Sequence, residues 1–145
     1  SIGSLINVSK LRFEYNQLIG EIPESIGNMT NLYGLYLEGN QLSGEIPSEI
    51  WNMTTLRHLR LRDNKFVGVI PSDIGNNTEF SLLSLGDNQL SGKIPPEICN
   101  ITMDWGAIWG GENYFYIDNN KFCPPYPSCI EDYVGEQDTS NCLPR

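Results

Sequence analysis

The chain has 145 residues, with 9 lysines and arginines against 18 aspartates and glutamates, and its formal net charge at pH 7 is −9. This length suits one domain, and the negative charge argues against nucleic-acid binding, which requires a basic face. No run of 18 apolar residues occurs, so we expect no direct membrane insertion by this segment.

The sequence begins in the middle of a repeat unit. Ile2 and Gly3 align with Ile26 and Gly27 of the next copy. Terminal repeats of a repetitive fold normally carry a polar cap that shields their apolar residues, and no such cap precedes Leu5. We therefore expect that a longer array precedes this segment.

The 24-residue period continues through most of the chain. The stretch from Asn40 to Asn64 reads NQLSGEIPSEIWNMTTLRHLRLRDN, nearly the same text starts at Asn16 and at Asn64, and a further copy opens at Asn88. A fixed period of this size with Leu-x-Leu-x-x-Asn in each copy is typical of leucine-rich repeats, which stack their copies into a solenoid.

Each copy contains one predicted strand, within residues 9–15, 33–39, 57–63, 81–87 and 113–119. Apolar residues spaced by two point to one side of a strand, and that side must be the core. These pairs are Leu11/Phe13, Leu35/Leu37, Leu59/Leu61, Leu83/Leu85 and Phe115/Ile117. An asparagine follows each pair three residues later, and we expect its amide to bond backbone groups of the turn. These asparagines are Asn16, Asn40, Asn64, Asn88 and Asn120.

Glycine and proline punctuate each copy after the strand. The glycines stand where the chain must turn and a positive φ favours this residue, and an Ile-Pro pair follows each of them; they are Gly20, Gly44, Gly68 and Gly92. The Leu-x-Gly-x-Ile-Pro phrase resembles the plant-type leucine-rich repeats of receptor-kinase ectodomains and polygalacturonase-inhibiting proteins, and related repeats in some algal and microbial surface proteins. The resemblance covers residues 1 to about 123. It implies an α/β-type solenoid with a parallel concave β-sheet, short second strands after the Ile-Pro segments and a 3-10 or irregular convex side.

The rhythm breaks after the fourth copy. The step from Asn88 to Asn120 is longer than one period, which implies an 8-residue insertion, and we place it within 102–113. The inserted stretch contains Trp105 and Trp109. These two rings either plug the end of the core or form an exposed aromatic ridge, which would supply a secondary ligand contact.

The four cysteines lie near the C-terminal end without a Cys-x-x-Cys arrangement, which favours disulfides of an exported protein over a metal site. The tail resembles the cysteine-bearing C-terminal caps of the plant-type family. We therefore divide the chain into leucine-rich repeats over residues 1–122 and a disulfide cap over residues 123–145. Four cysteines allow three pairings; we predict a small proline-stiffened loop closed by Cys123–Cys129, with Cys99–Cys142 tying the tail to the last regular repeat.

The outward positions of the strand windows line the concave face, where solenoids bind their ligands. Their charges balance: five are basic (Lys10, Arg12, Arg57, Arg60 and Arg62) and five are acidic (Glu14, Glu38, Asp63, Asp87 and Asp118). We take as candidate ligand-binding residues Arg12, Tyr36, His58, Arg60, Arg62 and Tyr116.

Arg60 and Arg62 form the basic centre of this face. They are two residues apart, so both can approach one carboxylate or sulfate. They resemble the Arg-x-Arg pair with which some plant peptide-hormone receptors hold the free carboxylate of their ligand. The alternative is a ladder of Glu and Arg that only keeps the face soluble. We expect Glu38 to neutralise Arg62 in part and no acid to accompany Arg60 in its column.

The only histidine is His58, and its simplest interpretation is a solvated residue among arginines. No Ser, Cys or carboxylate pair stands at a catalytic spacing around it, and no glycine-rich phosphate loop is present. We therefore expect no enzymatic activity, no cofactor and no metal ion.

Five Asn-x-Ser/Thr motifs are glycosylation candidates in a eukaryotic secretory protein. They begin at Asn7, Asn28, Asn52, Asn76 and Asn100. In the four that follow the 24-residue period, Asn and Thr can instead close the turn before the next strand.

These patterns favour a non-enzymatic, extracellular or cell-surface recognition module that binds a protein, peptide or anionic glycan on its concave face. One alternative is a structural building block of a surface layer, wall or filament, with lateral assembly between neighbouring subunits. The other is a secreted enzyme inhibitor of the polygalacturonase-inhibitor kind. Glycans at Asn28, Asn52 and Asn76 would shield that flank from lateral packing.

Overall fold

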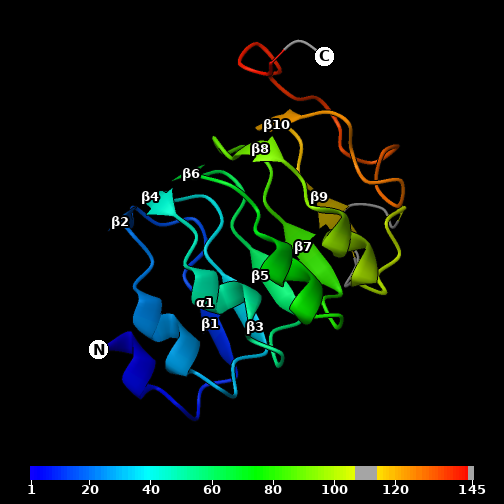
Figure 1. The fold of residues 1–145 in the computed structure, drawn as a ribbon. Coiled ribbons are helices and arrows are strands. Elements are labelled where there is room, and N and C mark those ends of the chain that lie inside the picture. Colours follow the sequence, from blue (N-terminus) through cyan, green and yellow to red (C-terminus); the bar gives the residue numbers. More distant parts are fainter. Residues whose placement is uncertain (107–113, 144–145) are drawn as a thin grey trace.

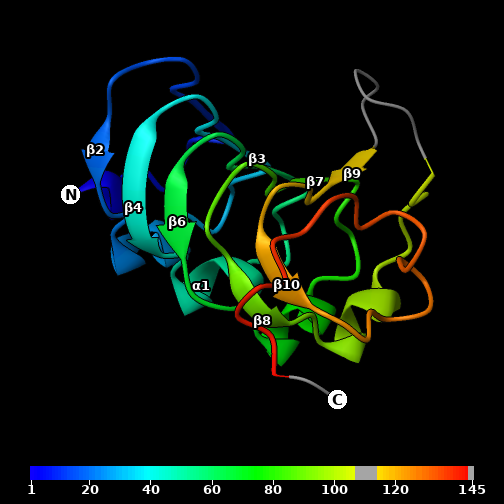
Figure 2. The same cartoon turned by 90° about the horizontal axis from the view of Figure 1, so that it is seen from above.

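A computed structural model describes residues 1–106 and 114–143, and its elements wind into coils stacked along one axis (Figures 1 and 2). In this part of the chain, one strand from each coil joins a five-stranded parallel sheet. In order along the sheet, these strands are β1 (Lys10–Arg12), β3 (Gly34–Tyr36), β5 (His58–Arg60), β7 (Leu82–Ser84) and β9 (Tyr114–Tyr116). Each strand lies within its predicted window, so the strand predictions are confirmed.

Short second strands form along one flank of the solenoid. In the described residues, β2 (Ile19–Gly20), β4 (Gln41–Glu45) and β6 (Lys65–Val67) make one parallel set, and β8 (Ser91–Lys93) pairs with β10 (Lys121–Cys123). The strands β2, β4, β6 and β8 precede the Ile-Pro segments, and the expectation that second strands follow them is wrong. The reason is that each proline caps the N-terminus of the next helical turn, where its fixed φ suits the start of a helix rather than a paired strand.

The convex side consists of short helical turns, as predicted. Within the described residues, four are 3-10 turns, and they are η1 (Ile2–Ser4), η2 (Glu24–Asn28), η3 (Ser72–Asn76) and η4 (Pro96–Asn100). The second coil has a single α-helical turn, α1 (Ser48–Trp51). No helix among residues 1–106 and 114–143 has the length and apolar character that a bilayer-spanning helix needs.

The predicted core columns are buried between the sheet and the convex turns. Leu59, Leu61, Leu83 and Leu85 each have a relative exposure of 0 %. Phe13 is the exception at 41 %, because it belongs to the first coil and no coil covers it on that side. The predicted turn glycines all have positive φ, with values of 87° at Gly20, 77° at Gly44, 91° at Gly68 and 79° at Gly92.

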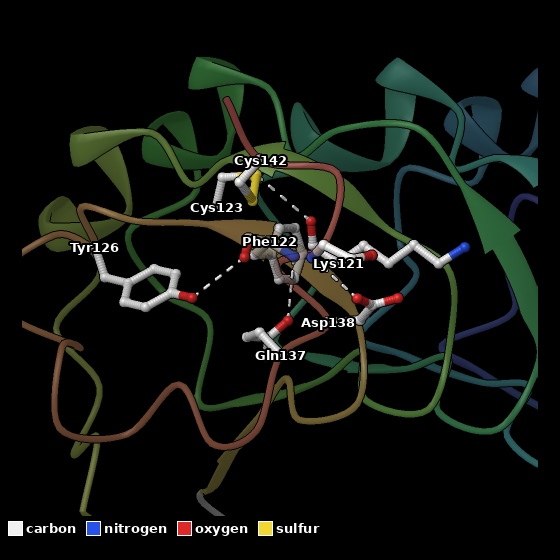
Figure 3. Close-up of a disulfide and its surroundings, with 8 residues drawn as sticks. Lys121, Phe122, Cys123, Tyr126, Gln137, Asp138 and Cys142 are labelled. Carbon is white, nitrogen blue, oxygen red and sulfur yellow. Dashed lines mark hydrogen bonds between the residues drawn. A yellow bond between two sulfur atoms is a disulfide. The ribbon is translucent and has the colours of Figure 1, made fainter. Parts of the chain in front are cut away.

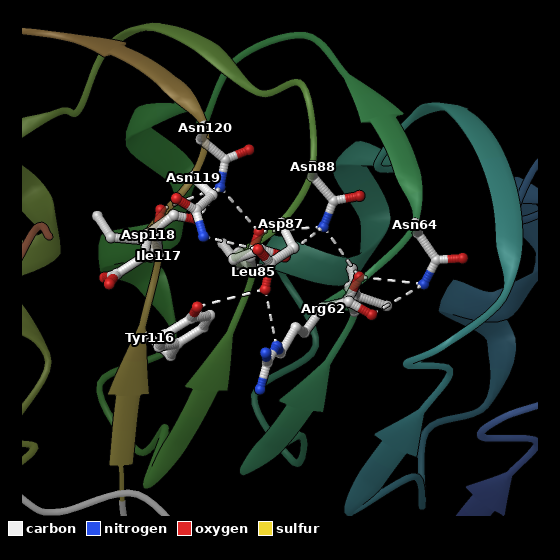
Figure 4. A network of polar contacts seen from close by, with 12 residues as sticks. Arg62, Asn64, Leu85, Asp87, Asn88, Tyr116, Ile117, Asp118, Asn119 and Asn120 are labelled. Carbon is white, nitrogen blue, oxygen red and sulfur yellow. Dashed lines mark hydrogen bonds and ion pairs between the residues drawn. The ribbon is translucent and has the colours of Figure 1, made fainter. Parts of the chain in front are cut away.

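A ladder of asparagine amides links each coil to its neighbour. Asn64 donates from Nδ2 to the carbonyl oxygens of Leu37 (2.9 Å) and Leu61 (3.1 Å), and its Oδ1 accepts from the amide N–H of Leu42 (2.9 Å). The same set of bonds is made by Asn40, Asn88 and Asn120, and three of these residues are drawn in Figure 4. The predicted role of the asparagine column is thus confirmed.

The disulfides join Cys99 to Cys129 and Cys123 to Cys142, so the predicted pairing of Cys123 with Cys129 and Cys99 with Cys142 is wrong. After β10 the chain crosses the end of the core, where Ile130 is fully buried. Cys129 therefore lies where a further convex turn would follow η4, and η4 carries Cys99. The tail then returns to the β10 edge, where Cys142 reaches Cys123 (Figure 3).

The inserted stretch contributes one described aromatic residue to the end of the core. The ring of Trp105 meets that of Phe115 edge to face, with centroids 4.9 Å apart, and packs against the hydrophobic core. Trp109, the second predicted contact, lies outside the described residues.

Candidate binding surface on the concave sheet

The strand register collects the candidate residues into adjacent columns. Parallel pairing aligns Arg12 with Tyr36, Tyr36 with Arg60, Arg60 with Ser84, and Ser84 with Tyr116. His58 stands in the next column, and Arg62 follows Arg60 by two residues on the same side of the chain. The structure therefore brings all six predicted residues onto one face of the sheet, on β1, β3, β5 and β9 or, for Arg62, just beyond β5.

Guanidinium groups alternate with tyrosine rings across this face. The Arg12 guanidinium carbon lies 4.1 Å from the centroid of the Tyr36 ring. That of Arg60 lies 5.6 Å from Tyr36 and 5.3 Å from Tyr114, and that of Arg62 lies 4.8 Å from Tyr116. These distances are in the range of cation–π contacts, which hold the charged groups flat against the sheet.

The tyrosine rings lie on the sheet rather than projecting from it. Tyr36 and Tyr114 have exposures of only 3 % and 4 %. Gly34 makes room for the Tyr36 ring, because a Cβ at this glycine would collide with it. Burial raises the pKa of Tyr36 and outweighs the opposite influence of Arg12.

His58 belongs to this aromatic cluster, which replaces the simple interpretation of a solvated residue. Its Nδ1 lies 2.7 Å from the Tyr36 hydroxyl, and its ring meets that of Tyr33 edge to face at 4.9 Å. Tyr33, with Lys10 5.6 Å from its ring centroid, is a neighbour that the sequence did not single out. Its position one residue before the strand column gave no periodic signal.

Each described arginine forms an ion pair, and the two central pairs differ from expectation. Glu38 Oε1 lies 3.2 Å from Arg60 Nη1, and Asp87 Oδ2 lies 2.8 Å from Arg62 Nε. The prediction that Glu38 accompanies Arg62 is therefore wrong. No acid occupies the column of Arg60, as predicted, but Glu38 reaches Arg60 from the adjacent column. The Arg62 guanidinium is paired with Asp87, and the Glu38 carboxylate instead pairs with Arg60. The outer pairs are Arg12 with Glu14 at 3.0 Å and Arg57 with Glu79 at 2.6 Å.

The two internal carboxylates sit in different surroundings. Glu38 is buried, and desolvation raises its pKa because the hydrogen bond from Arg60 offsets burial only in part. Burial would also raise the pKa of Asp87, but hydrogen bonds from Asn119 and Arg62 outweigh it and hold that pKa below its usual value. Figure 4 shows this network, in which the Tyr116 hydroxyl also donates to Asp87 at 3.3 Å.

The glycosylation candidates lie away from the concave columns. All five asparagines are exposed, and Asn76 donates to the Asn52 side-chain oxygen of the preceding coil at 2.9 Å. The inward role in that turn falls to the neighbouring Asn77, which is buried and donates to the carbonyl oxygens of Met53 and Leu56. Among residues 1–106 and 114–143, no group of three His, Cys, Asp or Glu side chains is arranged to hold a metal ion.

The family model described as Leucine Rich Repeat matches residues 7–29, 31–53, 55–77 and 80–101. The chain belongs to the leucine-rich repeat family. No curated protein sequence matched it. The two disulfides fit the cysteine-bearing cap expected for the plant-type members of this family.

Several solved structures resemble this chain. One is the ectodomain of the plant membrane receptor kinase GASSHO1/SCHENGEN3 from Arabidopsis thaliana in complex with CASPARIAN STRIP INTEGRITY FACTOR 2, at 34 % identity and a TM-score of 0.74 over 83 % of this chain and 14 % of that one. The PEPR1–AtPEP1 structure matches at 32 % identity and a TM-score of 0.78, over 91 % of this chain and 18 % of that one. A plant ice-binding protein matches at 31 % identity and a TM-score of 0.71, over 83 % of this chain and 37 % of that one. This chain thus spans well under half the length of these relatives.

Proposed function

We propose that this chain is a non-enzymatic, extracellular recognition module that binds an extended peptide or protein segment across its concave sheet. The observation that carries the proposal is the column of Arg12, Tyr36, Arg60, Ser84 and Tyr116, one residue from each strand of the five-stranded sheet. Aromatic rings and arginines are the side chains that dominate protein interfaces. Here neighbouring rings and ion pairs already hold them in place, which lowers the entropy lost on binding.

The dimensions of the sheet suit a short extended segment. Five parallel strands give four spacings, so the face spans about 20 Å, which about six residues of extended chain can cross. Because the charges of this face are internally paired, it offers the half-buried rings of His58 and Tyr116 and hydrogen-bonding groups rather than a strong net charge. The pattern favours a peptide over a highly anionic glycan.

The relatives and the disulfides support the same proposal. The GASSHO1/SCHENGEN3 structure is a complex with CASPARIAN STRIP INTEGRITY FACTOR 2. The Arabidopsis receptor kinase HAESA, which matches this chain at 32 % identity and a TM-score of 0.63 over 85 % of this chain and 24 % of that one, is in complex with the peptide hormone IDA and the co-receptor SERK1. Two disulfides in a chain of this size are typical of exported proteins, which supports an extracellular or cell-surface location.

The test is selection of a displayed library of random linear peptides on the immobilised chain, followed by titration calorimetry of the enriched peptides. Arg12→Ala should weaken binding about tenfold, because a cation and a hydrogen-bond donor leave the concave column. The Arg12 side chain is 56 % exposed, so its ion pair contributes little to folding. The matched control is Lys93→Ala, an exposed cation of β8.

Two results would overturn the proposal. The first is that no peptide is enriched on the wild-type chain over a surface without protein. The second is that Arg12→Ala and Lys93→Ala leave the affinities equal, which would move the site away from the concave sheet.

A further inference from the structure

The two central arginines of the concave face are already held by carboxylates of the chain itself. Arg60 Nη1 pairs with the Glu38 carboxylate, and Arg62 Nε pairs with the Asp87 carboxylate. The side chain of Arg60 still has an exposed fraction of 28 %, whereas that of Glu38 has 9 %. A ligand can therefore touch Arg60 while Glu38 remains beneath it as a fixed neighbour.

The Glu38–Arg60 pair is not arranged for greatest stability. It makes one hydrogen bond, and the buried atoms Glu38 Oε2 and Arg60 Nε have no partner among the described residues. Buried polar atoms are nearly always paired, and a buried ion pair is often no more stabilising than apolar side chains of the same volume. A role in recognition explains this pair better than a role in folding does.

The consequence for a ligand is electrostatic. A carboxylate or sulfate approaching Arg60 would meet the charge of Glu38 a few ångströms away, in a setting where water screens poorly. A carboxamide or hydroxyl group accepts a hydrogen bond from the guanidinium without that repulsion. Its own N–H or O–H can also face the carboxylate, which can only accept when it is ionised.

We propose that Glu38 is the specificity-determining residue of the concave site, admitting uncharged carboxamide or hydroxyl groups at Arg60 and excluding carboxylates and sulfates. This inference rests on the proposed function, because it names the chemical class of ligand group for the same surface. Asp87 has the corresponding position at Arg62, and its hydrogen bonds from Tyr116 and Asn119 hold it there.

One experiment tests the inference without any peptide. Acetate and sulfate are titrated separately into the 15N-labelled chain while the arginine Nε–Hε resonances are followed by NMR. In Glu38→Gln the Arg60 resonance should shift with an affinity about tenfold higher than in the wild type, because a charge-assisted hydrogen bond becomes available without repulsion. Glu79→Gln is the matched control, since it frees Arg57 and should leave the Arg60 titration unchanged.

A second measurement uses an enriched peptide that contains Asn or Gln, compared with its Asp or Glu counterpart. The wild type should favour the carboxamide peptide by about tenfold, and Glu38→Gln should remove that preference. Thermal melting confirms that the variant is folded, and Glu38→Met provides a second uncharged variant of similar volume. Equal anion affinities in the wild type and both variants would overturn the inference even if peptides bind, whereas failure to enrich any peptide would count against the proposed function alone.

Discussion

The ladder asparagines carry more of the fold than their polarity suggests. Each satisfies backbone groups of two coils, as Asn64 does with Leu37, Leu42 and Leu61. Replacing Asn64 by Leu adds apolar volume but leaves the Leu42 N–H without its acceptor. It also removes one of the two amide donors at each of the Leu37 and Leu61 carbonyl groups, which keep their bonds from Asn40 and Asn88. We expect the free energy of unfolding to fall by about 1–3 kcal/mol, measured by urea denaturation.

The control for this prediction is Asn16→Leu in the first coil. Asn16 is exposed and, among the residues that the structure describes, it donates only to the carbonyl oxygens of Phe13 and Glu14 in its own coil. Its replacement should cost less than that of Asn64. Equal losses at the two positions would show that the bonds between coils contribute nothing beyond the local turn.

Glu38 and Asp87 should affect stability with opposite dependence on pH. Burial places the folded pKa of Glu38 above its ordinary value of 4.5, so ionised Glu38 opposes folding at neutral pH and this penalty is lost as the pH falls to 4.5. Burial is outweighed at Asp87 by hydrogen bonds, and its folded pKa lies below the ordinary 3.8. Its stabilising contribution is therefore complete above 3.8 and is lost as the pH falls through the folded pKa.

The isosteric variants separate these two contributions. Glu38→Gln should be more stable than the wild type at neutral pH, with the difference vanishing below pH 4.5. Asp87→Asn should be less stable at neutral pH, with the difference closing below pH 3.8. Urea denaturation across this range provides the measurement, and two pH-independent differences would contradict the assigned surroundings.

Residue types were easier to predict than their partners. The Asn, Gly and Leu columns could be predicted because every copy repeats the same local requirement. The partner of Arg60 could not be predicted in this way. The register aligns Glu38 with Arg62, but the Glu38 side chain pairs diagonally with Arg60. Long flexible side chains can reach a partner in the same column or in an adjacent one, and the repeat period does not specify which.

At the scale of elements, Gln137 ends the asparagine ladder. Its Oε1 accepts from the Phe122 N–H at 3.2 Å, and its Nε2 donates to the carbonyl oxygens of Ile117 (3.0 Å) and Val134 (2.8 Å). These are the bonds of a ladder asparagine, one coil further on. The sequence concealed this because Gln137 follows Asn120 at a shorter interval than the regular period.

We expect Gln137→Leu to speed amide hydrogen exchange at Phe122 while leaving exchange in β5 unchanged. The side-chain acceptor is lost, and the buried N–H must open to water more often. Glu136→Gln is the adjacent control, because only the backbone of the exposed Glu136 is bonded to the last coil. Unchanged protection of Phe122 would show that the cap is held by its disulfides alone.

The disulfide Cys99–Cys129 fastens the cap to the last regular coil. It closes a segment with a sequence separation of 30, so its removal in Cys99→Ala/Cys129→Ala should cost about 3–4 kcal/mol. Mass spectrometry of a non-reduced digest checks the pairing, and thermal melting checks the cost. Peptides linked through Cys123 and Cys129 would contradict the assignment.

This pairing could not be predicted from spacing, since residues 124–128 look like a short closed loop. In the fold they are a bridge that carries Ile130 into the core beside η4.

At the scale of the whole described solenoid, the first and last coils differ. The fold was predictable at this scale because the 24-residue period sets strand, turn and convex segment together. At the C-terminal end, Ile130 and Val134 close the core, with exposures of 0 % and 6 %. At the other end, several large apolar side chains of the first coil remain exposed, namely Leu5, Ile6, Phe13, Tyr15, Leu18 and Ile19.

This asymmetry predicts the direction in which the structure opens. The stability of a solenoid is close to the sum of the intrinsic stability of each coil and the interface energy between adjacent coils. In this chain the first coil packs against one adjacent coil, whereas the coil that contains β5 packs against two. Amides of β1 should therefore exchange fastest among the sheet strands and those of β5 and β7 slowest, as measured by hydrogen exchange with mass spectrometry. In Cys99→Ala/Cys129→Ala the β9 and β10 amides should lose protection as well, while the order from β1 to β5 is kept. Uniform exchange across all strands would mean that the coils open as one cooperative unit, so that the interface energies between coils outweigh the exposed apolar end.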